Sequence, residues 1–177
     1  DALTIAGAVS GSNDSVAFGG AGSGSGNDID STVEALIVDS VLTTTSGGVS
    51  LLATDASDIT ADAGSGAISV AAGGDSAQAG IAVGAAAATN DIDNVARAAV
   101  LNSTVDAAGA ANLGAVSTAS IDTLTFGLAG SLAAGDSTSI GIAGAGSGSG
   151  NAVTNTVEAL VQGSTLTAGG DVRLSAT

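Results

Sequence analysis

The 177-residue chain contains no cysteine, histidine, proline, methionine, tryptophan or tyrosine, and only two phenylalanines. Without cysteine there is no disulfide framework or thiolate nucleophile, and without histidine the commonest general base and metal ligand is missing. Arg97 and Arg173 are the only basic residues against 17 acidic ones, so the formal charge is −15. Two cations cannot neutralise a run of phosphates, so the composition predicts no nucleic-acid partner.

No stretch of the chain offers the about 20 consecutive strongly apolar residues needed to cross a bilayer. Glycine and polar residues interrupt every candidate span, and we therefore expect no membrane insertion. There is also no charged segment followed by an apolar run, as in a signal peptide. Any secretion signal is thus expected outside these residues or already removed.

Glycine (28 residues) and acidic residues are abundant, but 45 % of the chain is apolar, and Val, Ile and Leu recur in short runs. Disordered acidic chains lack such runs. Because many of the apolar residues are alanine, we expect a thin, closely packed core, as in stacked sheets or a solenoid.

The chain contains an internal repeat. Three segments align without a gap on the anchor asparagines Asn27, Asn90 and Asn151, at spacings of 63 and 61 residues. Hydrophobic character is kept at fixed distances from these anchors, for example fifteen residues downstream at Leu42, Val105 and Leu166. Such self-similarity is typical of solenoid proteins.

Each repeat closes with a short strand-like piece that ends in threonine. These endings divide the chain into a single domain of three repeats, 1–54, 55–118 and 119–177. The terminal repeats do not differ from the interior as capping repeats do. The first residues, DALTI, also match DASDIT after Thr54. We therefore expect uncapped ends that stack head to tail.

The local pattern is that of β-strands. Apolar residues alternate with polar or small ones, as at Leu124, Phe126 and Leu128, and segments such as AGGD, TSGG and GSGSGN mark turns. The best helix candidate, residues 95–101, aligns with β-branched residues and is also expected to be a strand. GSGSG itself is interpreted as a strand whose tiny side chains let sheets or chains approach closely.

Repeats of about 60 residues with several short strands predict an all-β fold, a parallel β-solenoid or β-helix. We expect coils of roughly 20 residues, three per repeat, with two larger coils per repeat as the alternative. One set of equivalent positions tests the coil length. Glu34, Arg97 and Glu158 each follow an anchor asparagine by seven residues. If each repeat formed one wide coil, they would stack as a ladder of alternating charge. Otherwise they are exposed side chains on a solvated face.

Two pairs of carboxylates are the candidate metal ligands. Asp28 and Asp30, and one repeat later Asp91 and Asp93, are spaced i, i+2, which places each pair on one face of a strand. Oxygen ligands of this kind suit Ca²⁺, and no other cofactor is expected. The third repeat has no acid at either position, which favours the alternative that these acids are simply solvated.

No set of residues predicts catalysis. Paired carboxylates can hydrolyse glycosidic bonds, but polysaccharide-cleaving β-helices usually add a basic residue or histidine, and here the acids follow the repeat. We therefore expect no enzymatic activity. A polysaccharide-active β-helix, an ice-binding face and a Ca²⁺-binding surface layer remain as minor alternatives.

The third repeat, above all GSTLTAGGDVRLSAT (163–177), resembles the repeats of filamentous-haemagglutinin-type adhesins and the tandem arrays of giant secreted bacterial surface proteins. The second repeat matches more loosely. The resemblance implies a right-handed parallel β-helix, export to the cell surface or beyond, and a stalk, adhesive or fibre-forming role without catalytic residues. We therefore expect a segment or subunit of an extracellular fibre that associates head to tail and, as a further option, laterally. The alternative is the passive stalk of a monomeric adhesin.

Overall fold

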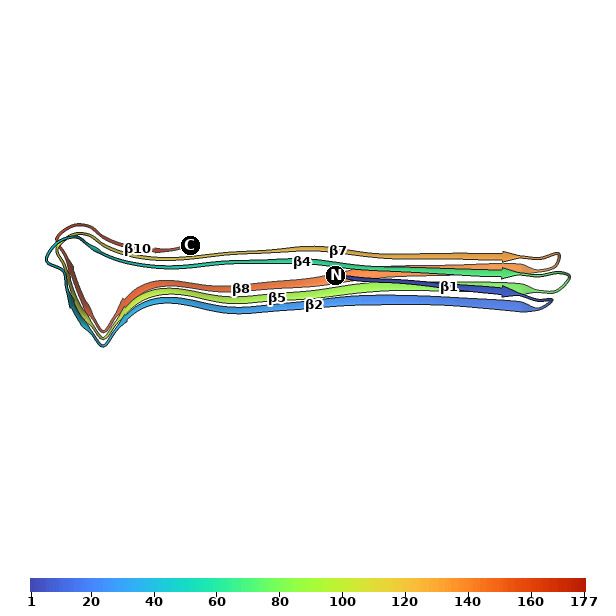
Figure 1. Cartoon of the computed structure of the whole chain (residues 1–177), viewed down its shortest axis with the longest axis horizontal. Coiled ribbons are helices and arrows are strands. Elements are labelled where there is room, and N and C mark those ends of the chain that lie inside the picture. The colour runs from blue at the N-terminus through green and yellow to red at the C-terminus, as the bar shows by residue number, and fades with distance from the viewer. The chain divides into compact units, whose positions relative to one another are not determined.

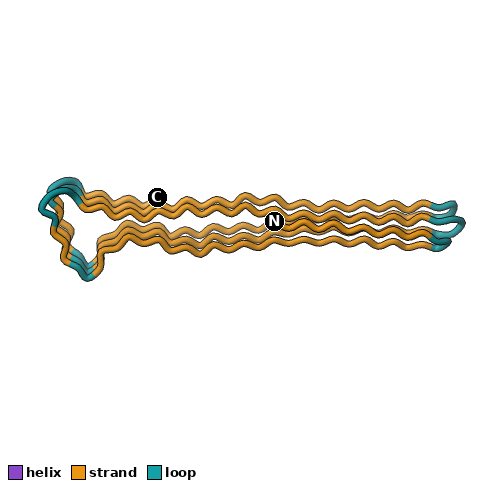
Figure 2. The backbone as a smooth tube through the Cα atoms, viewed as in Figure 1, coloured by secondary structure: helices purple, strands orange, loops and turns teal.

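The computed structural model describes all 177 residues and contains ten β-strands and no helix (Figures 1 and 2). The predicted all-β parallel solenoid is confirmed, and residues 95–101 lie in a strand as expected. The strands are β1 (Ala2–Gly11), β2 (Ser15–Val38), β3 (Val41–Thr43), β4 (Val49–Ala72), β5 (Gln78–Leu101), β6 (Thr104–Ala107), β7 (Ala111–Ala134), β8 (Ser139–Gln162), β9 (Thr165–Ala168) and β10 (Val172–Ala176).

Each repeat makes one coil of the solenoid. The three sheets have the strand orders β1-β4-β7-β10, β2-β5-β8 and β3-β6-β9, so every strand pairs with its counterpart one repeat away. In the third sheet, for example, Val41 pairs in parallel with Thr104, which pairs with Thr165. A coil consists of two long strands of 24 residues, such as β2 and β4, joined by a short corner strand. The prediction of roughly 20-residue coils is therefore wrong, and so is the alternative of two coils per repeat.

The residues group into two compact units, and each unit draws on all three repeats. Unit 1 comprises Asp1–Asn27, Ile59–Asn90 and Ile121–Asn151, and unit 2 comprises Asp28–Asp58, Asp91–Ser120 and Ala152–Thr177. The expected repeat boundaries at Thr54 and Thr118 fall inside β4 and β7, so the repeats do not correspond to separate structural elements.

Unit 1 has a thin interior, which is the physical reason for the long coils. Ala63, Ala86 and Ala88 are buried together in it. The two sheets approach so closely that a Cβ added to Gly19 would lie 2.6 Å from the carbonyl oxygen of Ile68. Because the side chains are this small, the two long sheets pack directly face to face. The coil therefore has two long sides instead of three short sides around a wider interior. GSGSG lies within β2 and again within β8, a strand as predicted, so the expectation that GSGSGN marks a turn is wrong.

Unit 2 holds the larger aliphatic core, around the corner strands. Val105 of β6 is fully buried, and Leu42 and Leu166 pack against it from the coils on either side, as their equal spacing from the anchors implied. The other buried members come from β4, β5 and β7: Leu51, Ala96, Ala98, Val100, Leu113 and Ala115.

The corner that follows each of β2, β5 and β8 contains one residue in the left-handed backbone region. These residues are Asp39, Asn102 and Gly163, with φ values of 46°, 48° and 60°. Glycine adopts this conformation without penalty, and asparagine and aspartate tolerate it better than other residues do. The column therefore varies among these three types while the backbone stays the same.

The pairing of β1 corrects one detail of the predicted repeat. Ala2 pairs with Ala63, so Asp1 lies in the column of Asp62 and the predicted match of DALTI with DASDIT is wrong. The predicted match differs from the observed register by an odd number of residues. It would have turned Leu3 and Ile5 into the thin interior, because a shift by one residue exchanges the two faces of a strand.

Candidate functional site

The three anchor asparagines form a hydrogen-bonded ladder in unit 1. Asn27 Nδ2 donates to Asn90 Oδ1 at 2.8 Å, and Asn90 Nδ2 donates to Asn151 Oδ1 at 2.9 Å. Asn90 Nδ2 also donates to Oγ1 of Thr123 at 2.9 Å, and Asn90 is 4 % exposed. Both amide bonds run in the same sense along the column. The ladder therefore offers an acceptor at Asn27 and a donor at Asn151 to any coil stacked beyond them.

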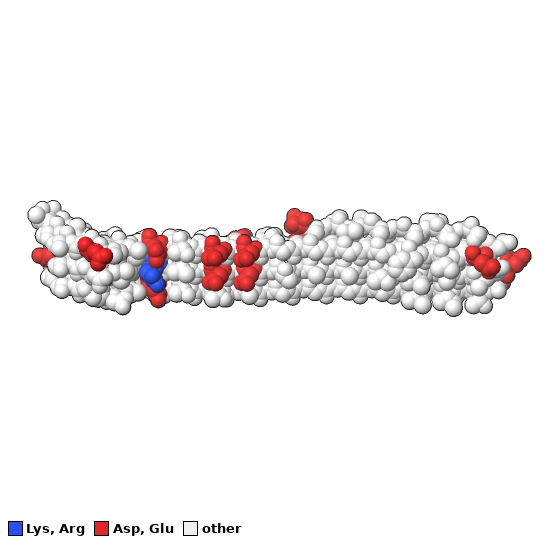
Figure 3. All heavy atoms as spheres, turned by 90° about the horizontal axis from the view of Figure 1, so that it is seen from below, with Lys and Arg blue, Asp and Glu red and all other residues white.

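An ion column crosses the three coils in unit 2. Arg97 Nε lies 2.7 Å from Glu158 Oε2, and Arg97 Nη1 lies 3.4 Å from Glu34 Oε1. Figure 3 shows the blue side chain between red ones. This is the ladder expected if each repeat forms one coil, and that conditional prediction is confirmed. All three side chains are about one-third exposed, so each pair is solvated and its contribution to stability is modest.

The four candidate metal ligands lie on the outer face of unit 2. They are exposed because buried residues such as Ile92 and Asn94 alternate with them along the strand. Figure 3 shows acidic side chains gathered in two neighbouring columns beside the ion column. The strand spacing thus brings Asp28, Asp30, Asp91 and Asp93 to one face as predicted. No group of three or more acidic side chains surrounds a point where a metal ion could bind, and Ca²⁺ binding stays a prediction.

Asp55 is a buried carboxylate outside the two predicted pairs of metal ligands. It is 6 % exposed in unit 2, and its nearest donor is Asn94 Nδ2, 2.7 Å from Oδ2. Ser31 Oγ donates to Oδ1 at 3.0 Å, and the hydroxyls of Ser57 and Ser117 lie at 3.2 and 3.4 Å from Oδ2. All four donors are neutral, so hydrogen bonds alone stabilise this charge. Alternation along the strand was the available signal, but it does not reveal which face is buried.

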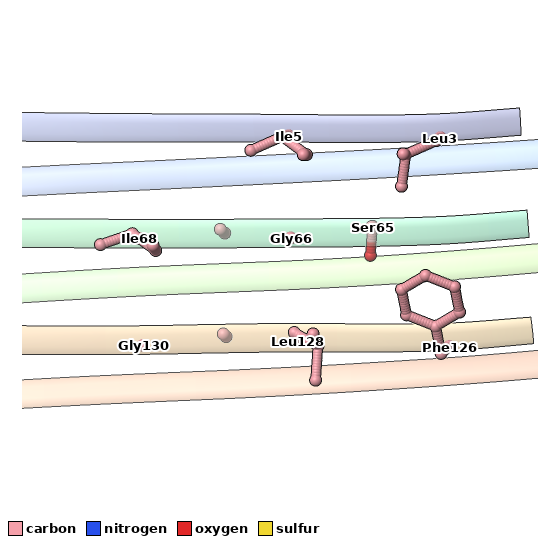
Figure 4. Close-up of a pocket in the computed structure, with 10 residues that line it drawn as sticks. Leu3, Ile5, Ser65, Gly66, Ile68, Phe126, Leu128 and Gly130 are labelled. Carbon is pink, nitrogen blue, oxygen red and sulfur yellow. The ribbon is translucent and has the colours of Figure 1, made fainter.

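Unit 1 exposes an apolar face on the outer side of β1, β4 and β7. A groove of about 380 Å³ runs across it, lined chiefly by Leu3, Ile5, Ile68, Phe126 and Leu128 (Figure 4). Leu3 and Ile5 are 67 % and 75 % exposed. The sequence pattern detected the alternation of large residues here, but it did not show that they face solvent.

Comparison with known proteins found no matching family model, no similar curated protein and no similar solved structure. The structure has no helix that is long and apolar enough to span a membrane. The role of the protein has therefore to be inferred from its stacked columns, its strand edges and its outer faces.

Proposed function

We propose that the chain is a structural segment or subunit of an extracellular β-solenoid fibre, at or beyond the bacterial cell surface. The observation that carries this proposal is the continuity of the amide ladder and the ion column through all three coils. In the amide ladder each coil presents to the next the same kinds of group that it receives from the previous one. In the ion column the charge alternates from coil to coil. A structure of this kind extends by adding coils.

The strand edges support axial growth. β2 and β8 are long strands at opposite edges of their sheet, and each has one side without a strand partner. Unpaired backbone N–H and C=O groups on such edges template further pairing. A coil that adds there, from the same polypeptide or from a second copy, makes a heterologous contact that does not close and so produces a filament.

The proposed role is mechanical, without catalysis or a bound cofactor. Apart from the buried Asp55, the acidic side chains lie along the outer surface and do not converge with a base in a cleft. Location outside the cell is the part of the proposal supported by the resemblance of the third repeat to secreted surface arrays.

The ion column favours a second candidate, the passive stalk of a monomeric adhesin. The column ends in Glu34 on one side and Glu158 on the other. Two identical copies stacked head to tail would therefore bring like charges together, which is unfavourable between adjacent strands. A neighbouring coil with Lys or Arg in this column would continue the alternation, as in a longer chain of non-identical repeats.

Electron microscopy and fibre diffraction of the purified chain test these candidates. Long fibres with an axial spacing of about 4.8 Å are expected for the fibre subunit, and short rods for the stalk. The variant Glu158→Gln removes the like charge from the junction and should lengthen the fibres at low salt. Gln162→Glu, which adds a charge four residues away on the same strand, is the opposite control. Particles without the axial β-spacing would contradict both candidates.

A further inference from the structure

The outer face of β1, β4 and β7 in unit 1 carries no charged side chain along the stretch that forms the groove. Its outward residues are exposed although most are large and apolar. Soluble proteins rarely expose contiguous apolar patches of this kind without using them in an interaction. The large residues of this face are Leu3, Ile5, Val9, Ile68, Leu124, Phe126, Leu128 and Leu132.

At the two middle outward positions of this face, a large side chain and a glycine alternate from coil to coil. The two middle outward positions are Ile5 and Gly7 in the first coil, and Leu128 and Gly130 in the third. The middle coil has the reverse order, Gly66 and then Ile68. Strand pairing sets Ile5 beside Gly66 and Gly7 beside Ile68, and Figure 4 shows Leu128 and Gly130 continuing these two columns. Ile68 is thus a knob between two glycines, and Gly66 is the floor of a hole between Ile5 and Leu128.

The chain's own fold does not require these glycines. A Cβ added to Gly7, Gly66 or Gly130 would meet no atom within 4 Å, in contrast to the crowded Gly19. Their φ angles are also those of ordinary strand residues. Because glycine weakens a strand interior, it often marks a place where another surface approaches closely. What these three positions provide is free space above the sheet.

We infer that a second copy of this chain packs on this face across a two-fold axis. The axis lies in the interface between the two facing sheets, parallel to them and perpendicular to the strands, and passes between the columns of Gly66 and Ile68. The strands of the two copies are then antiparallel and their coils follow the same order. Ile68 of the second copy enters the hole at Gly66, and the Ile5 and Leu128 side chains meet Gly7 and Gly130. A two-fold contact of this kind is isologous, so each contact between a large side chain and a glycine occurs twice, once on either side of the axis.

The size of the face agrees with a stable contact. Eight large apolar side chains, each exposing on the order of 100 Å², offer on the order of 800 Å² per copy. This is the area that each partner contributes to a standard interface. Because the axis runs along the direction in which coils stack, further coils would extend the contact. The inference thus rests on the proposed role in an assembly, but it concerns a lateral contact that closes at two copies.

Sedimentation equilibrium over a range of concentrations tests the contact. The wild-type chain is expected to dimerise, and Ile68→Asp should raise the dissociation constant at least about tenfold, since the carboxylate would be buried in an apolar hole. Val83→Asp is the matched control, because Val83 is also exposed in the middle coil of unit 1 but lies on the other sheet. Equal unfolding midpoints for the two variants would establish that both are folded.

Disulfide trapping gives a second, geometric readout, since the chain has no cysteine of its own. A mixture of Gly66→Cys and Ile68→Cys chains should form mixed disulfides in large excess over a Val83→Cys control. A wild-type chain that stays monomeric, or an Ile68→Asp variant that dimerises as the wild type does, would overturn the inference. So would equal trapping in mixture and control. If a lipid or another protein covers this face instead, the purified wild-type chain would stay monomeric, which is one of these contradicting results.

The proposed lateral contact and the proposed axial contact can be tested independently. Ile68→Asp should leave axial fibres in place and reduce their width from paired to single solenoids in electron micrographs. A dimer that depends on Ile68, formed without any fibre, would contradict the axial proposal and support the lateral one. Fibres whose width is the same in wild type and variant would support the axial proposal and contradict the lateral one.

Discussion

Asn27 donates a hydrogen bond to Asn90 over 2.8 Å although 63 residues of chain separate them. The bond is possible because one complete coil lies between the two positions, and parallel pairing returns the chain to the same column. The buried amide of Asn90 also disfavours other registers, because a slipped strand would leave this polar group without its partners. The ladder therefore serves as a register mark for the solenoid.

Substitution of the central ladder residue is expected to destabilise the fold. Asn90→Ala removes both amide contacts of the ladder and the bond to the Thr123 hydroxyl, and at about 0.5–1.5 kcal/mol for each hydrogen bond the expected cost is about 1–3 kcal/mol in the free energy of unfolding. Urea denaturation measures this. Asn112→Ala is the control, because Asn112 is exposed on β7. Equal effects of the two substitutions would mean that the ladder does not contribute to stability.

Loss of the arginine in the ion column should have a small, salt-dependent effect. Arg97→Gln removes two partly exposed ion pairs and is expected to cost no more than about 1 kcal/mol at low salt. The difference from wild type should shrink as salt is added, because exposed charges are screened. Arg173→Gln is the matched control, since Arg173 has no ion-pair partner. A larger effect that persists in high salt would show that the column acts through packing.

Trypsin should distinguish the two arginines. Arg97 lies in β5, which has strands on both sides, so cleavage there requires the coil to open. Arg173 lies in β10, an exposed strand at the edge of its sheet, and should be cut first. Mass spectrometry of a native digest should therefore show loss of the residues after Arg173 while the rest stays intact. Early cleavage at Arg97 would contradict the central position of β5.

Removal of the buried carboxylate is expected to destabilise unit 2. Asp55→Ala leaves Asn94 Nδ2 without its closest acceptor and the Ser31 hydroxyl without Oδ1, which should cost about 1–3 kcal/mol. Asp55→Asn retains one acceptor oxygen and should cost less. Asp62→Ala, at an exposed position, serves as the control in thermal or urea unfolding. A neutral effect of Asp55→Ala would indicate that removing the buried charge offsets the lost hydrogen bonds.

The stacked acids on the outer face predict that stability depends on salt and on Ca²⁺. Asp91 and Asp93 lie one coil away from Asp28 and Asp30, so like charges are neighbours and repel one another at low ionic strength. The double substitution Asp91→Asn, Asp93→Asn should raise the melting temperature at low salt and reduce its dependence on salt. Calorimetric titration separates the two interpretations of these acids. Specific Ca²⁺ binding requires saturable heat in the wild type that the double variant lacks, whereas solvated acids give none in either.

The sequence by itself determined the strands, the repeat and the columns. Asn27, Asn90 and Asn151 align without knowledge of the fold, and parallel stacking makes aligned residues neighbours. The same reasoning placed Asp28 with Asp30, and Asp91 with Asp93, on common faces, because a strand alternates with a period of two. It also gave Glu34, Arg97 and Glu158 as a ladder, on the condition that each repeat is one coil.

Only the tertiary structure decided the length of a coil and which face of each strand is inside. Period-two alternation is identical for both faces, so it did not show that Phe126 faces solvent or that Asp55 is buried. The coil length depends on how closely two sheets approach, as at Gly19, where a carbonyl group lies in the position that a side chain would need. That distance is set by side chains from strands far apart in the chain. It therefore emerges only when the two sheets are packed against each other.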